Sequence, residues 1–131
     1  MAKILLVEDD KILNRMYQTM LQNHGHQVNI GMDGEEGLRM ALEEHPDLIL
    51  LDIRMPKMDG MTMLDFLRQD EWGKNAKVII LTNLDPTNYI LKGVVADYPT
   101  YYLIKSNTKS EEILERIEEV LEEQKQNINT E

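Results

Sequence analysis

The chain has 131 residues, enough for one domain with one sizeable core, and its lack of cysteine excludes disulfides, a thiol nucleophile and a cysteine-based zinc site. Its 24 acidic and 14 basic residues give a net charge of −10, and because such a surface would repel duplex nucleic acid, we expect no direct nucleic-acid binding by this chain. No apolar run approaches the roughly 20 residues that span a bilayer and no signal-peptide pattern opens the chain, so we expect a cytoplasmic protein without a membrane contact.

A run of four apolar residues, Ile4 to Val7, is too short for a helix and rich in strand formers, and it predicts a buried strand. Three carboxylates, Glu8, Asp9 and Asp10, follow it directly. Acids in this place are typical of a helix N-terminus, where Asp9 or Asp10 can cap the helix that follows. They are also what a divalent cation requires, because hard ions prefer several carboxylate oxygens. The residues alone leave both interpretations open.

The rest of the chain alternates between helices, indicated by apolar residues at helical spacing, and strands, indicated by short apolar runs. In chain order we predict a helix over 12–21, a strand over 27–30, a helix over 33–42, a strand over 48–51, a helix over 60–67, a strand over 78–81, a helix from 85 that ends before 99, a strand over 101–104 and a helix over 108–121. In this prediction residues 1–124 form the domain, and residues 125–131 are a polar tail, disordered or left from a linker.

Five alternations of strand and helix predict a parallel sheet covered by helices on both faces, which is an α/β three-layer sandwich. The predicted strand order is 2-1-3-4-5, the flavodoxin-like arrangement. In this order the first and third strands diverge at a crevice at the carboxyl edge of the sheet, where ligands of such folds bind.

Polar residues follow the ends of four predicted strands: Asp9 with Asp10, then Asp52, Thr82 and Lys105. In a parallel sheet these ends share one edge, and neighbouring strands lie about 4.8 Å apart, so the side chains converge. Mg²⁺ would relieve the repulsion among the carboxylates and can be held by one or two of them together with a phosphate. A cation, an ammonium group and a hydroxyl around one carboxylate would stabilise its attack on phosphorus. We therefore interpret Asp52 as a phosphoryl acceptor.

Residues 2 to about 122 resemble the receiver domain of two-component response regulators. The resemblance lies in Val7 to Asp10, in Leu51 to Gly60 with its specific Asp-x-x-Met-Pro-x-Met-Asp-Gly string, in Thr82 and in Lys105. It implies a phosphoacceptor that switches on phosphorylation and is not an enzyme, because it catalyses only its own phosphorylation and dephosphorylation. The phosphoryl donor would be a phosphohistidine on a sensor histidine kinase or a phosphotransfer protein.

The resemblance also implies site residues. Mg²⁺ would be held by Asp10, by Asp52 and by the backbone carbonyl of Arg54, with Asp9 binding directly or through water. Thr82 and Lys105 would contact the phosphoryl oxygens.

Tyr102 matches the switch aromatic of the family. Phosphorylation adds negative charge and acceptor oxygens, which would draw Thr82 inward and let the aromatic ring rotate into the space it leaves. The face built by the fourth helix, the fifth strand and the fifth helix would change shape and bind an unknown downstream protein. The chain would act as a monomer or as a phosphorylation-dependent homodimer.

Two departures from the family pattern lie beside the expected site. Ser106 follows Lys105 where the family usually has proline, and Asn83 follows Thr82 where a small residue is usual. They motivate an alternative function, that of a degenerate receiver acting as a phosphorylation-independent protein-interaction module.

Two enzyme-like alternatives fit less well. An aspartyl phosphatase of the dehalogenase type would need an acid where Arg54 stands. A flavodoxin-type flavin carrier would need a hydroxyl- and glycine-rich phosphate loop in place of the acids that follow the first strand.

Overall fold

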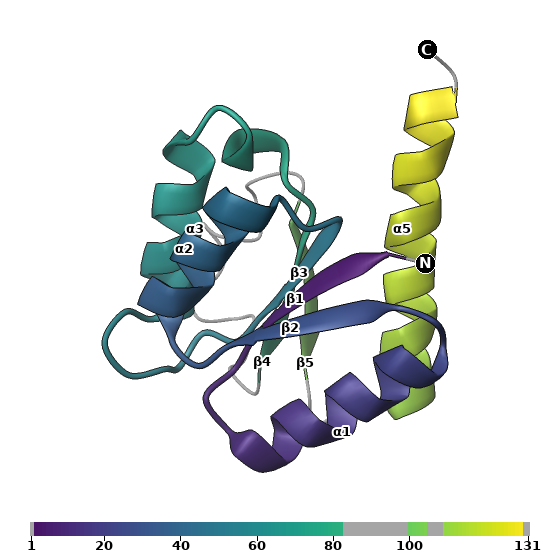
Figure 1. The fold of residues 1–131 in the computed structure, drawn as a ribbon, viewed down its shortest axis with the longest axis horizontal. Helices are drawn as coiled ribbons and strands as arrows, with labels where there is room; N and C mark the ends of the chain where they lie inside the picture. Colours follow the sequence, from purple (N-terminus) through teal and green to yellow (C-terminus); the bar gives the residue numbers. More distant parts are fainter. Residues whose placement is uncertain (1, 83–99, 105–108, 130–131) are drawn as a thin grey trace.

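The computed structural model describes residues 2–82, 100–104 and 109–129. Within them, five parallel strands form one sheet in the order β2-β1-β3-β4-β5, which confirms the predicted order (Figure 1). The strands are β1 Lys3–Val7, β2 Gln27–Gly31, β3 Leu48–Leu51, β4 Val78–Thr82 and β5 Thr100–Ile104.

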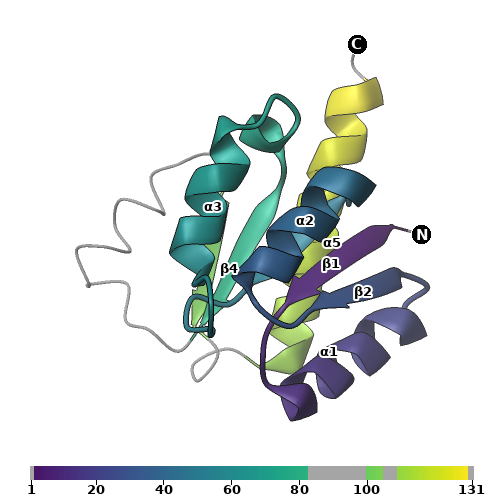
Figure 2. The same ribbon diagram turned by 60° about the vertical axis from the view of Figure 1, so that its left-hand side comes forward.

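Helices cover both faces of this sheet, as the alternation of elements predicted (Figures 1 and 2). They are α1 Lys11–Asn23, α2 Gly34–Glu44, α3 Gly60–Gln69 and α5 Ser110–Asn129, with a short 3-10 turn, η1, at Gly73–Asn75. The helix predicted from residue 85 lies outside the described residues. Over the parts of the chain that are described, none of the helices has the length and apolar character needed to traverse a lipid bilayer.

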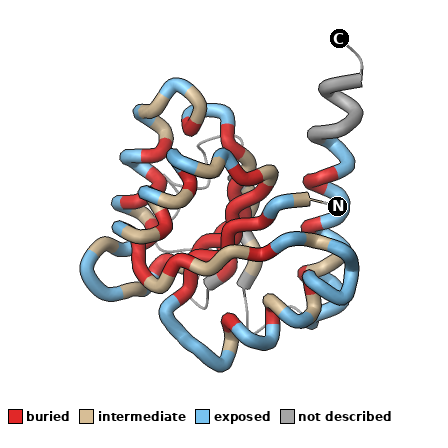
Figure 3. The backbone as a smooth tube through the Cα atoms, viewed as in Figure 1, coloured by how far each residue is buried: buried red, intermediate tan, exposed pale blue. Residues whose placement is uncertain are grey.

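The period-two alternation of the strands divides the core between the two faces. Leu5 and Val7 of β1 pack with residues of α2 and α3, whereas Ile4 and Leu6 pack with residues of α1 and α5. All four residues of β3 are completely buried, as the centre of the sheet in Figure 3 illustrates. A continuous apolar run is what a strand covered on both faces requires.

Local contacts define the start of α2 and the end of α1. The Asp33 side chain caps α2 by accepting a hydrogen bond from the Glu36 amide at 2.9 Å. The turn after α1 places Gly25 at a φ of +85°, a left-handed conformation that favours glycine.

The last helix is longer than its apolar stripe indicated. It runs to Asn129, so residues 125–129 are helical rather than part of a disordered tail. The domain boundary at residue 124 stays a prediction.

Candidate functional site

Three carboxylates meet at the carboxyl ends of β1 and β3, which are neighbours in the sheet. Val7 and Leu51 are paired in register, so the residues that follow them, Glu8 and Asp52, leave the two strands at the same level. One oxygen from each carboxylate of Glu8, Asp9 and Asp52 lies within 4.8 Å of the other two. The crevice predicted between the first and third strands is therefore lined by acids.

This donor set fits a hard divalent cation such as Mg²⁺. Mg²⁺ takes oxygen ligands at close range and keeps some of its coordination sites for water or phosphate, which a cluster of three carboxylates allows. Glu8 is almost completely buried, at 3 % exposed, Asp52 is partly buried and Asp9 is exposed. Because burial disfavours an ionised carboxylate, a cation between these groups would lower the cost of keeping them together.

The structure does not bring Asp10 into this cluster. Its side chain caps α1 and accepts hydrogen bonds from the amides of Ile12 at 2.9 Å and Leu13 at 3.2 Å. Glu8, which was not among the predicted metal ligands, stands in the cluster instead. The sequence placed all three acids at this point but did not specify which of them caps the helix, and the structure assigns that role to Asp10.

The loop after Asp52 is closed by hydrogen bonds from two of its own backbone amides. The Ile53 amide donates to Oδ1 of Asp52 at 2.8 Å, and the Gly60 amide donates to the Ile53 carbonyl at 2.8 Å. Arg54, whose carbonyl is an expected metal ligand, lies in this loop and is exposed. These bonds fix the path of the chain on both sides of Arg54.

The same loop is bound to the start of α2. The Gly34 amide donates to the Met58 carbonyl at 2.9 Å, and Nζ of Lys57 lies 3.7 Å from Oδ2 of Asp33. Lys57 has a φ of +65°, at the centre of a tight turn in which the Met58 amide bonds the Pro56 carbonyl at 2.8 Å. A lysine in this conformation is strained, so neighbouring contacts must hold the turn in place.

The structure describes the remaining predicted site residues only in part. Thr82 ends β4 opposite Ile104, and Tyr102 pairs with Ile80, so their backbones stand at the expected positions of the sheet. Their side chains are not described, and Lys105 lies outside the described residues. The roles assigned to these three residues stay predictions.

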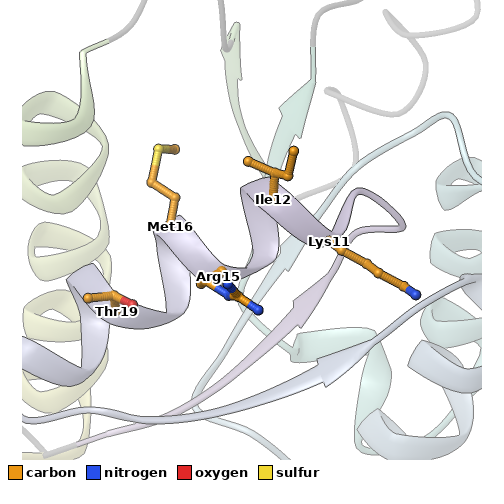
Figure 4. A pocket seen from close by; sticks show the side chains of 5 residues that line it. All are labelled: Lys11, Ile12, Arg15, Met16 and Thr19. Carbon is orange, nitrogen blue, oxygen red and sulfur yellow. The ribbon is translucent and has the colours of Figure 1, made fainter.

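A groove of about 480 Å³ lies on α1, whose first residue directly follows the acidic loop. Figure 4 shows the side chains that line it: Lys11, Ile12, Arg15, Met16 and Thr19. Ile12 is 82 % exposed and Met16 is 44 % exposed, so two large apolar side chains face solvent next to two cations. Apolar residues at helical spacing predict a buried helix face, so the exposure of these two side chains could not be anticipated from the sequence.

Comparison with known families agrees with the fold and the acidic site. The model of the response regulator receiver domain matches residues 4–126, and the chain therefore belongs to this family. Receiver domains are signalling domains of two-component systems.

The DNA-binding dual master transcriptional regulator RpaA of Synechocystis is 31 % identical over 121 residues, which are 92 % of this chain and 49 % of RpaA. The chain thus spans about half the length of this relative.

Solved structures give the same assignment. The receiver domain of the Francisella response regulator 1452 superposes with a TM-score of 0.83 and 28 % identity, over 95 % of this chain and 99 % of that one. The response regulator protein TrrA of Thermotoga maritima, solved in complex with Mg²⁺–BeF, has a TM-score of 0.77 and 29 % identity, over 92 % of this chain and 99 % of that one.

Proposed function

We propose that this chain is a phosphoacceptor receiver, in which Asp52 takes a phosphoryl group from a phosphohistidine of a sensor histidine kinase or a phosphotransfer protein. The observation that carries the proposal is the convergence of Glu8, Asp9 and Asp52 at one sheet edge, with carboxylate oxygens within 4.8 Å of one another. A chain of this family with this donor set is suited to Mg²⁺-dependent phosphoryl transfer in the cytoplasm.

In the proposed reaction an oxygen of Asp52 attacks phosphorus, the P–N bond of the donor breaks, and the imidazole leaves with its electron pair. Mg²⁺ supplies positive charge to the phosphoryl oxygens when it is bound. Glu8 and Asp9 would hold it together with Asp52 and the Arg54 carbonyl. The Ile53 amide, which bonds Oδ1 of Asp52, would restrict rotation of the carboxylate as it attacks.

The groove on α1 supports a protein as the donor. The chain carries a charge of −10, yet this surface, which begins one residue after Asp10, presents the cations Lys11 and Arg15 beside the exposed apolar pair Ile12 and Met16 (Figure 4). We assign it to a helix of the phosphodonor protein, with apolar residues against Ile12 and Met16 and acids against the neighbouring cations.

The output would be a change of the surface that includes β5 and α5. Thr82 and Tyr102 are the proposed switch residues, and Lys105 is the proposed phosphate contact. A downstream protein, or a second copy of the chain, would bind the changed surface.

The test uses a small phosphodonor such as acetyl phosphate, with and without Mg²⁺, and intact-mass measurement of the protein. We expect one phosphoryl group per chain that needs Mg²⁺, survives acid and is lost in base. Asp52→Asn should abolish the uptake. Asp59→Asn is the matched control, because Asp59 belongs to the same motif but caps α3 through the Thr62 amide at 2.8 Å. Equal phosphate uptake by Asp52→Asn would rule out the assignment.

The identities of Asn83 and Ser106 favour one other candidate, a receiver that binds its partner without phosphorylation. For this candidate, partner affinity would be the same with and without phosphodonor and unchanged by Asp52→Asn. A binding titration of the partner against both forms separates the two functions.

A further inference from the structure

Asn14 is a buried polar residue next to the acidic cluster. It lies in the second turn of α1 and is 4 % exposed. Its Nδ2 donates a hydrogen bond of 2.8 Å to the backbone carbonyl of Glu8 and lies 3.5 Å from Sδ of Met32. Because a carbonyl oxygen only accepts, the amide nitrogen must be the atom that faces Glu8.

Asn14 holds the acidic loop at two points. Its side chain bonds the Glu8 carbonyl, and its own backbone amide bonds the Asp10 carbonyl at 2.9 Å. Asp9, the exposed member of the cluster, is the single residue between these two anchors. The position of Asp9 relative to Asp52 is therefore set from both sides by one residue of α1.

Fold stability alone does not account for an asparagine at this position. Among the residues that the structure describes, Oδ1 of Asn14 is buried and has no hydrogen-bond partner. A buried acceptor without a partner is destabilising. Leucine has nearly the same volume and would remove this acceptor, but it would leave the buried Glu8 carbonyl without the hydrogen bond that Asn14 donates. Because one unsatisfied acceptor would replace another, stability gives asparagine little advantage, and its benefit lies in what the bond to Glu8 positions.

We propose that Asn14 is a positioning residue for the metal site, and that its bond to the Glu8 carbonyl sets the spacing of the Glu8 and Asp9 carboxylates from Asp52. The inference rests on the proposed function, because it concerns the affinity of that site for Mg²⁺. Residues that orient metal ligands without touching the metal typically change affinity by about 10- to 100-fold when they are replaced.

The experiment measures the Mg²⁺ affinity of the full chain by calorimetric titration for the wild type, Asn14→Leu and Asn29→Leu. Asn29 is the matched control, because its Nδ2 also donates a side-chain hydrogen bond, to Glu44, but it lies on β2 away from the acidic loop. We expect Asn14→Leu to weaken Mg²⁺ binding at least tenfold and Asn29→Leu to change it less than twofold. The urea midpoint of Asn14→Leu should stay close to that of the wild type.

A second readout separates positioning from damage to the fold. With acetyl phosphate as donor, Asn14→Leu should be phosphorylated slowly at low Mg²⁺ and at nearly the wild-type rate once Mg²⁺ is saturating. A rate that stays low at saturating Mg²⁺ would overturn the inference, as would an affinity within twofold of the wild type. If Asn14→Leu does not fold, Asn14→Ser takes its place with the same thresholds.

The same measurements on the wild type separate a failure of this inference from a failure of the proposed function. A wild type that neither binds Mg²⁺ at millimolar concentration nor accepts a phosphoryl group refutes the proposed function, and the role of Asn14 with it. A wild type that does both, beside an Asn14→Leu variant of equal affinity, refutes the role of Asn14 alone.

Discussion

Replacing Gly60 by alanine tests how closely α3 must approach the peptide of Asp52. A Cβ atom built on Gly60 would meet the Asp52 carbonyl oxygen well inside 3.0 Å, a separation that real Cβ atoms essentially never show. It would also lie 3.0 Å from the Asp52 carbonyl carbon and 3.0 Å from Cα of Ile53. All three are backbone atoms, so no side chain can rotate away, and the loop itself must retreat.

The size of the effect follows from two opposing contributions. Overpacking against a rigid neighbour costs about 1–3 kcal/mol, whereas alanine in place of glycine in a helix gains at most about 1 kcal/mol. The loop is also tied at this point, because the Gly60 amide bonds the Ile53 carbonyl at 2.8 Å, so a retreat strains that bond. We expect the free energy of unfolding to fall by about 2 kcal/mol, which leaves a domain of this size folded.

The assay is urea unfolding followed by the fluorescence of Trp72, the one tryptophan of the chain, which stacks on His45 at a centroid distance of 4.3 Å. Phosphorylation from acetyl phosphate is measured on the same sample, and we expect its rate to fall at least tenfold because Asp52 moves with the loop.

Gly25→Ala is the control, since its Cβ would meet nothing within 4 Å and only the positive φ opposes it, at a cost of about 1 kcal/mol. A Gly60→Ala protein with unchanged stability and unchanged phosphorylation would refute the reasoning.

Four further outcomes are expected. Asp10→Ala should lower the free energy of unfolding by about 1 kcal/mol in urea, since it removes a helix cap, and leave Mg²⁺ affinity within twofold by calorimetry. Asp9→Asn should do the reverse, with no loss of stability and at least tenfold weaker Mg²⁺ binding. Lys57→Val should destabilise by about 1 kcal/mol, because a β-branched residue is poorly tolerated at positive φ, and Lys57→Gly should not. Mg²⁺ at ten times its dissociation constant should stabilise the wild type by about 1.4 kcal/mol in thermal unfolding.

The sheet could be predicted from the sequence because its signals are local and strong. The run Leu48 to Leu51 is too short for a helix and has no polar face, so it is stable only as a strand covered on both sides. All four residues of β3 are in fact buried at the centre of the sheet. The handedness of the crossovers then limits the possible strand orders to a few. Asp52 follows this run directly, which is why its place at the carboxyl edge could be inferred from one chain.

Other features depend on choices that a single sequence leaves open. Glu8, Asp9 and Asp10 are equivalent as residue types, and which of them caps α1 depends on whether the helix begins at Lys11 or one residue earlier. A shift of the helix start by one residue would therefore turn a helix cap into a candidate metal ligand, or the reverse. The length of α5 had a weaker signal, since its apolar stripe ends at Leu121 while good helix formers continue beyond it.

The contacts that hold the acidic site together could not be predicted from the sequence, because both end on backbone carbonyls, whose partners no residue type specifies. The carbonyl of Met58 is bound by Gly34 from α2, and the carbonyl of Glu8 is bound by Asn14 from α1. Neither bond depends on a motif. Both act against the same force, because carboxylates within 4.8 Å of one another repel and would drive their loops apart. Hydrogen bonds from both faces of the sheet hold these loops in place against the repulsion, which a bound cation would relieve.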